Sequence, residues 1–362
     1  MWVTAVEARP LRSLSDVRVE LSEGIVSLIG PNGAGKTNLL EALYFALTGR
    51  SFRTSDRREL IPFGGQFARA EAVVRDRDGI EHRLLASVSR EQGRRHLLDG
   101  EPAEPAEVPR HRPPVAVFSP DRLALVKGPP AERRAHLDRY VAARWPARTG
   151  LRRRYGQALA QRNALIARLA GGYSGGDLEV WDAALAEAAE ALVASRSEAV
   201  AELAAPFADA AEELGLAGGG ELAYAPRAAG SATEIHKGLV DRREADLRLG
   251  RTSWGPHLDE LKIDAGGRSL RRYGSQGQQR AGLLALLFAE REALLAAHRV
   301  APLLLLDDVM SELDPDRRGR LVGRLVAGGQ ALITAAAEES VPARALEHRV
   351  RMPLDVVRSA AA

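Results

Sequence analysis

The sequence predicts an α/β protein in which a module built on a parallel sheet is interrupted by a mainly helical insert. Short apolar runs of strand length, at residues 25–29 and 301–306, lie far apart in the chain and each leads into a polar loop. Between them, residues 120–214 change to Ala, Leu, Glu and Arg at helical period. With 45% hydrophobic and 27% charged residues, the 362-residue chain has the composition of a folded protein of about two domains.

In chain order, strands are expected at Ile25–Ile29, Ala70–Val74 and Val115–Phe118, and a helix is expected from Leu39 to Leu47, ending at Gly49. Within the insert, the helical period is clearest at Leu151–Leu169, which Gly171-Gly172 closes, and at Leu178–Leu203. Downstream, the pattern predicts strands at Glu221–Tyr224, Leu258–Ile263 and Ala301–Leu306, with an apolar helix at Ala281–Leu295. We therefore expect three segments: 1–119, 120–245 as the helical insert, and 246–362.

The insert is expected to be a compact helical bundle. Leu178, Leu185, Leu192 and Leu203 could also line a coiled-coil seam, but the segment holds fewer than about four clean heptads.

A glycine-rich loop after the first strand is the most specific motif. Gly30-Pro31-Asn32-Gly33-Ala34-Gly35-Lys36-Thr37 fits the pattern G-x-x-x-x-G-K-[ST] at every required position. Its glycines let backbone N–H groups face phosphate oxygens at a helix N-terminus. Lys36 is expected to reach the β- and γ-phosphates, and the Thr37 hydroxyl to ligate Mg²⁺. The predicted ligand is therefore a nucleoside triphosphate with Mg²⁺.

Two carboxylates end the late apolar strand. Leu303-Leu304-Leu305-Leu306 leads directly into Asp307-Asp308, which places the acids at the carboxyl end of a buried strand. Asp307 is expected to hold Mg²⁺ opposite Thr37, and Asp308 to orient or deprotonate the attacking water.

A second candidate anion site lies in the segment Gly274-Ser275-Gln276-Gly277-Gln278-Gln279-Arg280. It precedes the apolar helix Ala281–Leu295, so Ser275 and the amides after it are expected at a helix N-terminus. Because the loop at 30–37 already wraps the phosphates, this segment is expected to serve the γ-phosphate held by another copy of the chain. A polar turn, Ser311-Glu312-Leu313-Asp314, follows the two carboxylates.

Composition narrows the protein class further. No apolar run reaches the roughly 18 residues that span a bilayer, and no signal-peptide pattern opens the chain, so a cytoplasmic protein without a membrane partner is expected. The absence of cysteine excludes Cys-ligated zinc. Net charge is +3, and the basic residues are nearly all arginine, with clusters at residues 50–58 and 152–154 that suit either nucleic acid or a solvated face.

The order of these four motifs resembles that of the ABC-type ATPase heads of SMC-like DNA-maintenance proteins, and more closely that of the RecF family of bacterial gap-repair proteins. The match runs from the N-terminal strand to about residue 340. Further segments that match the family are Gly49–Arg53, Ser119–Asp121, Leu125–Pro129, Arg133–Asp138 and Gly255–His257.

The resemblance implies an ABC-type ATPase head, a P-loop NTPase fold, whose inserted helical arm replaces a long coiled coil. It implies ATP-dependent homodimers that bind DNA at junctions of single and double strands. Partners implied are RecO and RecR, with RecA loaded on gaps coated by single-strand-binding protein, in DNA replication, repair and the SOS response. ATP hydrolysis would be weak, DNA-stimulated and used as a switch.

Carried over by motif, the loop Gly30–Thr37 with Asn38 would hold ATP and Mg²⁺. Asp307 would complete the metal shell and Asp308 would support hydrolysis. Asp308 stands where the wider superfamily has Glu, and its shorter side chain is compatible with slow turnover.

Ser275 and Gly277 would contact the γ-phosphate of the partner copy. Arg50 and Arg53 match family positions near the nucleotide, with ATP and DNA both open as the group they contact. For the glutamine that contacts the metal in relatives, Gln66 is the nearest candidate, with a surface role as the alternative.

Three other classes compete. A transporter's nucleotide-binding subunit would share the four motifs, but its helical insert is usually short, whereas residues 38–302 separate the motifs here. A chromosome-tethering SMC-like ATPase would need long runs of heptads. A stand-alone P-loop kinase would not explain the segment at 274–280.

Overall fold

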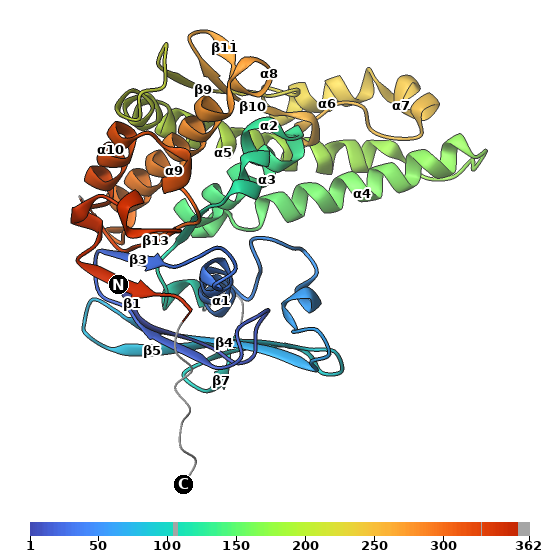
Figure 1. Ribbon diagram of the computed structural model, residues 1–362. Coiled ribbons are helices and arrows are strands. Elements are labelled where there is room, and N and C mark those ends of the chain that lie inside the picture. Colours follow the sequence, from blue (N-terminus) through green and yellow to red (C-terminus); the bar gives the residue numbers. More distant parts are fainter. Residues whose placement is uncertain (104–107, 327, 354–362) are drawn as a thin grey trace. The chain divides into compact units, whose positions relative to one another are not determined.

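The computed structural model describes residues 1–103, 108–326 and 328–353 (Figure 1). The chain forms two compact units. The first unit combines residues 1–122 with 294–362, and the second comprises residues 123–293. The segment boundaries expected at 119 and 245 stay predictions.

A five-stranded parallel sheet in the first unit carries the predicted strands. Its order is β14-β3-β13-β12-β8. The strands are β3 (Ile25–Ile29), β8 (Val115–Phe118), β12 (Leu303–Leu306), β13 (Ala331–Ala335) and β14 (His348–Arg351). Because β3, β12 and β13 are buried along their whole length, they consist almost entirely of apolar residues. The strand predicted at Ala301 begins two residues later, at Leu303.

A second, antiparallel sheet lies on the other side of helix α1 (Lys36–Thr48), as Figure 1 shows. Its order is β2-β1-β4-β5-β6-β7. The strands are β1 (Trp2–Ala8), β2 (Val17–Glu20), β4 (Phe67–Arg75), β5 (Glu81–Ser89), β6 (Gly93–Leu98) and β7 (Glu101–Pro102). Side chains of both sheets and of α1 form one hydrophobic core, which fixes the start of α1 at the carboxyl end of β3.

The first unit also contains α10 (Pro315–Val326). The short 3₁₀ helices of the chain are η1 (Arg57–Leu60), η2 (Val108–Arg110), η3 (Pro120–Leu123), η4 (Pro146–Arg148), η5 (Pro256–Leu258), η6 (Met310–Glu312), η7 (Glu338–Ser340) and η8 (Ala343–Ala345).

The second unit is mainly helical. Its helices are α2 (Ala124–Lys127), α3 (Pro130–Arg144), α4 (Leu151–Ala170), α5 (Leu178–Glu213), α6 (Ala232–Val240), α7 (Arg243–Leu249), α8 (Leu270–Tyr273) and α9 (Gln276–His298), the last of which continues into the first unit. A small antiparallel sheet has the order β11-β10-β9, from β9 (Gly220–Ala225), β10 (Glu260–Ala265) and β11 (Arg268–Ser269).

Helix α5 organises the second unit. The four leucines that could have lined a coiled-coil seam are buried, but α5 contacts α3, α4, α6 and β9, so the arrangement is a compact helical one. Charged side chains also lie among these buried leucines of α5. On α5, Asp182 pairs with the fully buried Arg162 of α4 at 2.5 Å, and Arg196 pairs with Asp138 of α3 at 2.8 Å. Such pairs fix the register of the helices, because a misaligned helix would leave a buried charge without its partner.

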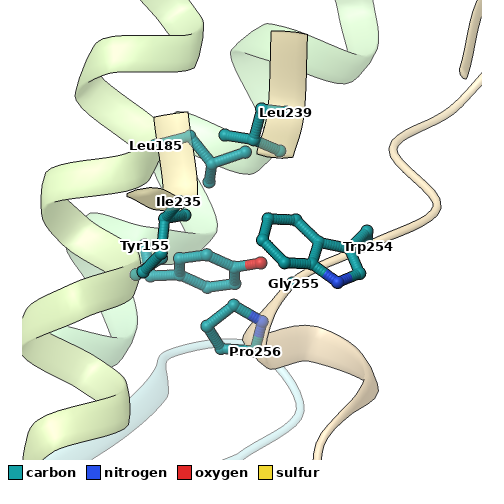
Figure 2. Close-up of a pocket in the computed structure, with 8 residues that line it drawn as sticks. Tyr155, Leu185, Ile235, Leu239, Trp254, Gly255 and Pro256 are labelled. Atoms are coloured by element: carbon teal, nitrogen blue, oxygen red, sulfur yellow. The ribbon is translucent and has the colours of Figure 1, made fainter. Parts of the chain in front are cut away.

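The Gly255-Pro256-His257 segment has a packing role in the second unit. Figure 2 shows Tyr155 of α4 and Trp254 and Pro256 of the loop before β10 packed with Leu185 of α5. The Tyr155 hydroxyl lies 2.7 Å from His257 Nδ1, and His257 Nε2 lies 3.2 Å from the Thr252 carbonyl oxygen. Gly255 has φ of 141°, and a Cβ there would lie 2.7 Å from the Tyr155 hydroxyl, so no larger residue fits.

Other predicted elements also differ in their limits, and the helix expected to end at Leu203 continues to Glu213. The strand expected from Leu258 begins at Glu260, because Pro256–Leu258 forms a 3₁₀ turn. The helix expected from Ala281 begins at Gln276, so the polar segment before it is the first turn of α9.

Candidate functional site

The phosphate-loop motif forms the connection from β3 to α1. Gly33 and Gly35 have φ of 83° and 90°, conformations that side-chain-bearing residues rarely adopt. Gly35 is the N-cap of α1. In the described part of the chain around this loop, no N-cap side chain accepts a hydrogen bond from the first-turn N–H groups of α1. Amides at a helix N-terminus that lack a side-chain cap are the donors that a phosphate group needs.

Lys36 is folded back along the loop. Its Nζ donates hydrogen bonds to the carbonyl oxygens of Gly30 and Pro31, at 2.6 and 2.9 Å. Partial burial lowers the pKa of Lys36, while the negative charges of Asp307 and Asp308 act in the opposite direction. The ammonium group is therefore held by the two carbonyl oxygens, within the electrostatic influence of both aspartates.

The back of the loop is closed by the end of β14. A Cβ on Gly30 would lie 2.2 Å from the carbonyl oxygen of Met352, and the Met352 N–H donates to the Ile29 carbonyl oxygen at 2.7 Å. Glycine at position 30 is therefore required by packing as well as by phosphate geometry.

Thr37 and Asp307, predicted to share a metal ion, are in direct contact. The Thr37 hydroxyl lies 2.9 Å from both carboxylate oxygens of Asp307, across 270 positions of sequence. A hydroxyl and a carboxylate are the hard oxygen donors that Mg²⁺ takes, so these residues fit the predicted ion. When bound, Mg²⁺ would neutralise phosphate charge beside Thr37 and Asp307.

Thr334 links the carboxylate of Asp307 to the backbone of Asp308, and the sequence pattern did not single it out. Strand β13 lies between β3 and β12, so its Thr334 faces the space between the loop and Asp307. Its hydroxyl donates to Asp307 Oδ1 at 2.9 Å and accepts the Asp308 N–H at 2.8 Å. Asp308 has φ of 51°, and this hydrogen bond holds its backbone in the left-handed conformation.

Burial raises the pKa of Asp307 above its ordinary value of 3.8. Hydrogen bonds from Thr334 and Thr37 favour the ionised form, the Asp308 charge opposes it, and Arg53 favours it. A buried carboxylate whose ionised form is disfavoured gains from a cation at close range.

A fully buried carboxylate, Glu41, organises the arginines at this end of α1. Arg12 forms two hydrogen bonds with it at 3.0 Å, and Arg53 Nη1 lies 3.3 Å from Glu41 Oε2 and 3.2 Å from Asn38 Oδ1. The Ser51 hydroxyl donates to the same carboxylate at 2.5 Å. Arg53 therefore lies along the first two turns of α1, next to the phosphate loop.

Ser275 begins helix α9 in a reciprocal cap. The Ser275 N–H donates to Gln278 Oε1 at 2.9 Å, and the Gln278 N–H lies 3.3 Å from the Ser275 hydroxyl oxygen. Gly277 lies in the first turn of this helix. The capping pair explains why the helix starts before Ala281. The loop and the two carboxylates belong to the first unit, whereas Ser275 and Gly277 belong to the second.

Gln66 is exposed just before β4, and its backbone carbonyl accepts the Arg90 N–H at 3.1 Å. Among the described residues, no hydrogen bond joins its side chain to Thr37 or Asp307. Its assignment as a metal contact stays a prediction.

The parts of the chain that the structure describes contain no helix long and apolar enough to cross a lipid bilayer.

The parallel sheet, the loop between β3 and α1, and the acids after β12 define an ABC-type ATPase head with an inserted, mainly helical arm. The sequence matches the family "RecF/RecN/SMC N terminal domain" over residues 2–353. Within this family the chain belongs to RecF, since relatives of that kind match it over most of its length.

The DNA replication and repair protein RecF of Streptomyces avermitilis is 37% identical over 361 residues, covering 94% of this chain and 95% of that protein. The protein of the same name from Anaeromyxobacter sp. is 40% identical over 350 residues, covering 92% of each.

Among solved structures, the recombination mediator RecF with ATP, in the RecFOR pathway, has a TM-score of 0.84 at 29% identity, covering 94% of this chain and 93% of that one. An Smc head bound to the C-terminal winged-helix domain of ScpA has a TM-score of 0.58 at 18% identity, covering 95% and 92%, a likeness of fold alone.

Proposed function

We propose that this chain is an ATP-dependent DNA-binding protein of recombinational gap repair. Two copies would close on ATP and hold DNA at junctions of single and double strands. With RecO and RecR, the dimer would promote loading of RecA on gaps coated by single-strand-binding protein, in the cytoplasm. Slow, DNA-stimulated hydrolysis would release the dimer.

The contact between Thr37 and Asp307 carries the nucleotide part of this proposal. It brings the loop after β3 and the acid after β12 together, which supports a site for ATP with Mg²⁺. The names of the relatives, and the ATP complex of a structurally similar RecF, support nucleotide binding and a DNA repair role.

Each residue has a proposed task. The N–H groups of Gly33–Thr37 and the Lys36 ammonium would bind the β- and γ-phosphates. Thr37 and Asp307 would hold Mg²⁺, and Asp308 would orient the attacking water. Ser275 and Gly277 would complete the site of the partner copy, so that ATP shifts the equilibrium from monomer to dimer.

The test compares DNA binding and sedimentation with Mg-ATP, Mg-ADP and no nucleotide. The proposal expects dimers and tight DNA binding with Mg-ATP alone. A protein that stays monomeric at saturating Mg-ATP and binds DNA no better for its presence would contradict it. Ser275→Arg should keep ATP binding and lose dimerisation, because the bulky side chain would block the second copy; the matched control is Arg271→Gln, which changes an exposed residue of α8 nearby.

A further inference from the structure

A second set of cationic side chains lies at the opposite end of α1 from the phosphate loop. We call Arg50, Arg57, Arg94 and Arg112 the arginine cluster. Arg50 follows Gly49, the residue after α1; Arg57 begins η1; Arg94 lies on β6; and Arg112 precedes β8. The stretch after α1 thus contributes two arginines, and β6 and the segment before β8 contribute one each.

Strand β6 is attached directly to the end of α1. His96 Nε2 lies 3.0 Å from the Ala46 carbonyl oxygen, and a Cβ on Gly49 would lie 3.4 Å from His96 Nδ1. Arg94 is two residues before His96, so both point to the same face of the sheet, toward α1.

The charges of the cluster act on one another. Burial lowers the pKa of Arg57, and the positive charges of Arg94 and Arg50 lower it further. Burial likewise lowers the pKa of Arg112 to about 10, and Arg50 adds to that effect. The four guanidinium groups therefore lie within electrostatic reach of their neighbours.

These arginines have no acidic partners among the described residues. No ion pair joins any of the four to Asp or Glu within residues 1–103, 108–326 and 328–353. The Nε atoms of Arg57 and Arg112 are buried without a hydrogen-bond partner. The exposed members, Arg50 and Arg94, are the ones that an external anion can reach, and the unpaired charges of Arg57 and Arg112 add to the positive potential there.

Capping of α1 does not account for the cluster. Among the described residues, no hydrogen bond joins a guanidinium group of the cluster to a carbonyl oxygen of α1; the Phe45 carbonyl accepts from the Gly49 N–H at 2.7 Å, and the Ala46 carbonyl oxygen lies 3.0 Å from His96 Nε2. The arginines therefore do not cap the helix end.

The nucleotide at the phosphate loop does not account for it either. Helix α1 has 13 residues, so its two ends lie about 20 Å apart at about 1.5 Å per residue. A triphosphate on Gly33–Thr37 lies beyond the reach of an arginine near Gly49.

We propose that the arginine cluster binds backbone phosphates of DNA. The inference rests on the proposed DNA-binding function and assigns a surface to it. Guanidinium groups bind phosphate oxygens in a bidentate manner, and an array drawn from several segments suits a chain of successive phosphates. An acidic peptide is the competing class of partner, and its binding in place of DNA would overturn the proposal.

The experiment uses the full chain with Arg50→Gln and Arg94→Gln combined, because both residues are exposed and their loss leaves the core intact. The matched control combines Arg83→Gln with Arg95→Gln. These exposed arginines lie on β5 and β6 but on the opposite face of the same sheet. Fluorescence anisotropy measures binding of a labelled DNA junction against NaCl concentration, with Mg-ATP present; poly-glutamate replaces DNA in a parallel titration.

The double variant should bind DNA at least about tenfold more weakly at moderate salt, and the slope of log K against log salt should fall by about 2, since each lost phosphate contact removes about 0.9. ATP binding and melting temperature should stay at their wild-type values, and the control should bind DNA normally. The variant Arg50→Lys with Arg94→Lys, which keeps both charges, should retain most of the slope.

If the wild-type chain binds DNA and the double variant matches the control, the surface is wrong while the proposed function stands. If the double variant loses poly-glutamate binding and keeps DNA binding, the cluster serves an acidic partner and the inference is overturned. If the wild-type chain binds no DNA with ATP, the proposed function itself fails, and the inference fails with it.

Discussion

The arginine side chains at the two ends of helix α1 differ in whether they have acidic partners. At the N-terminal end, Arg12 and Arg53 are held by the buried carboxylate of Glu41, and the negative charges of Asp307 and Asp308 act on Lys36. At the C-terminal end, Arg50, Arg57, Arg94 and Arg112 gather without an acidic partner in the described parts of the chain. One helix thus connects a charge-balanced region to a positively charged one.

The difference indicates how binding energy is used at each end. Charges that are already paired in the protein are fixed in position, which suits a site that must hold one triphosphate in a single geometry. Unpaired charges suit a surface whose affinity comes from the anion itself and therefore depends on salt.

Lys36→Met should weaken ATP binding about 100-fold or more, because it removes charge-assisted hydrogen bonds worth about 3 kcal/mol. The weak DNA binding that remains without nucleotide should keep its salt dependence, since the arginine cluster is untouched. Fluorescent ATP-analogue titration and anisotropy measure the two quantities, with the exposed Lys127→Met as control. Loss of both would show that the ends of α1 are not independent.

Asp308→Asn should lower the rate of ATP hydrolysis by about 100-fold, the usual contribution of a residue that orients or deprotonates water. ATP binding should remain, so the dimer should persist longer than that of the wild type. Steady-state phosphate release and sedimentation measure both, with the exposed Asp316→Asn as control. Unchanged turnover would remove Asp308 from the mechanism.

Glu41→Gln should destabilise the protein by about 2–4 kcal/mol, because it leaves the guanidinium groups of Arg12 and Arg53 without their buried counter-charge. In this variant the arginines at the N-terminal end of α1 would lack an acidic partner, like those at the C-terminal end. Urea unfolding without nucleotide measures the effect, and Glu81→Gln, which breaks an exposed pair with Arg75, should cost at most about 1 kcal/mol. Equal effects of the two substitutions would contradict a special role for the buried carboxylate.

Thr334→Val should lower kcat about tenfold with a smaller change in KM, because it removes the hydrogen bonds that hold Asp307 and Asp308, worth about 1–3 kcal/mol. Thr334→Ser keeps the hydroxyl and should restore kcat. If valine and serine behave alike, Thr334 acts by packing alone.

The pH dependence of stability should show the smallest effect. The folded protein binds the Asp307 proton more tightly than the unfolded chain, since burial raises its pKa above 3.8. The contribution of Asp307 to the free energy of unfolding is therefore largest below pH 3.8, and it falls as the pH rises from 3.8 through the raised pKa. Without Mg²⁺ and nucleotide, Asp307→Asn should gain stability relative to wild type as pH rises from about 4 to 7. Thermal unfolding at several pH values tests the sign, and a relative loss would contradict it.

The sequence pattern predicted the helices and strands whose apolar residues form a regular pattern within one segment of the chain. Ile25–Ile29 agrees with β3, which is buried along its whole length and therefore apolar, and Val115–Phe118 agrees with β8, an apolar run whose last two residues are buried. The start of α9 was misplaced, because Gly277 weakens the helical pattern and the Ser275–Gln278 cap is visible only as a pair.

The long-range parts of the site could not be predicted in this way. Glu41 lies on α1 among apolar residues, and nothing local indicates that Arg12 and Arg53 converge on it. Thr334 gains its position from the order of the strands, with β13 between β3 and β12. The roles of Lys36, Ser275, Asp308 and the other predicted site residues stay predictions that the variants above test.

The packing of Met352 against Gly30 has a consequence for how the chain folds as it leaves the ribosome. The glycine-rich loop is made before the residues that contact it, Asp307 and Met352, which lie 270 or more positions later in the sequence. Domains commonly fold as units during synthesis, from the N-terminus onward. Here the nucleotide pocket cannot form until β12 and β14 have been made, so a nascent chain stalled before β12 would expose an unfinished sheet to chaperones and proteases.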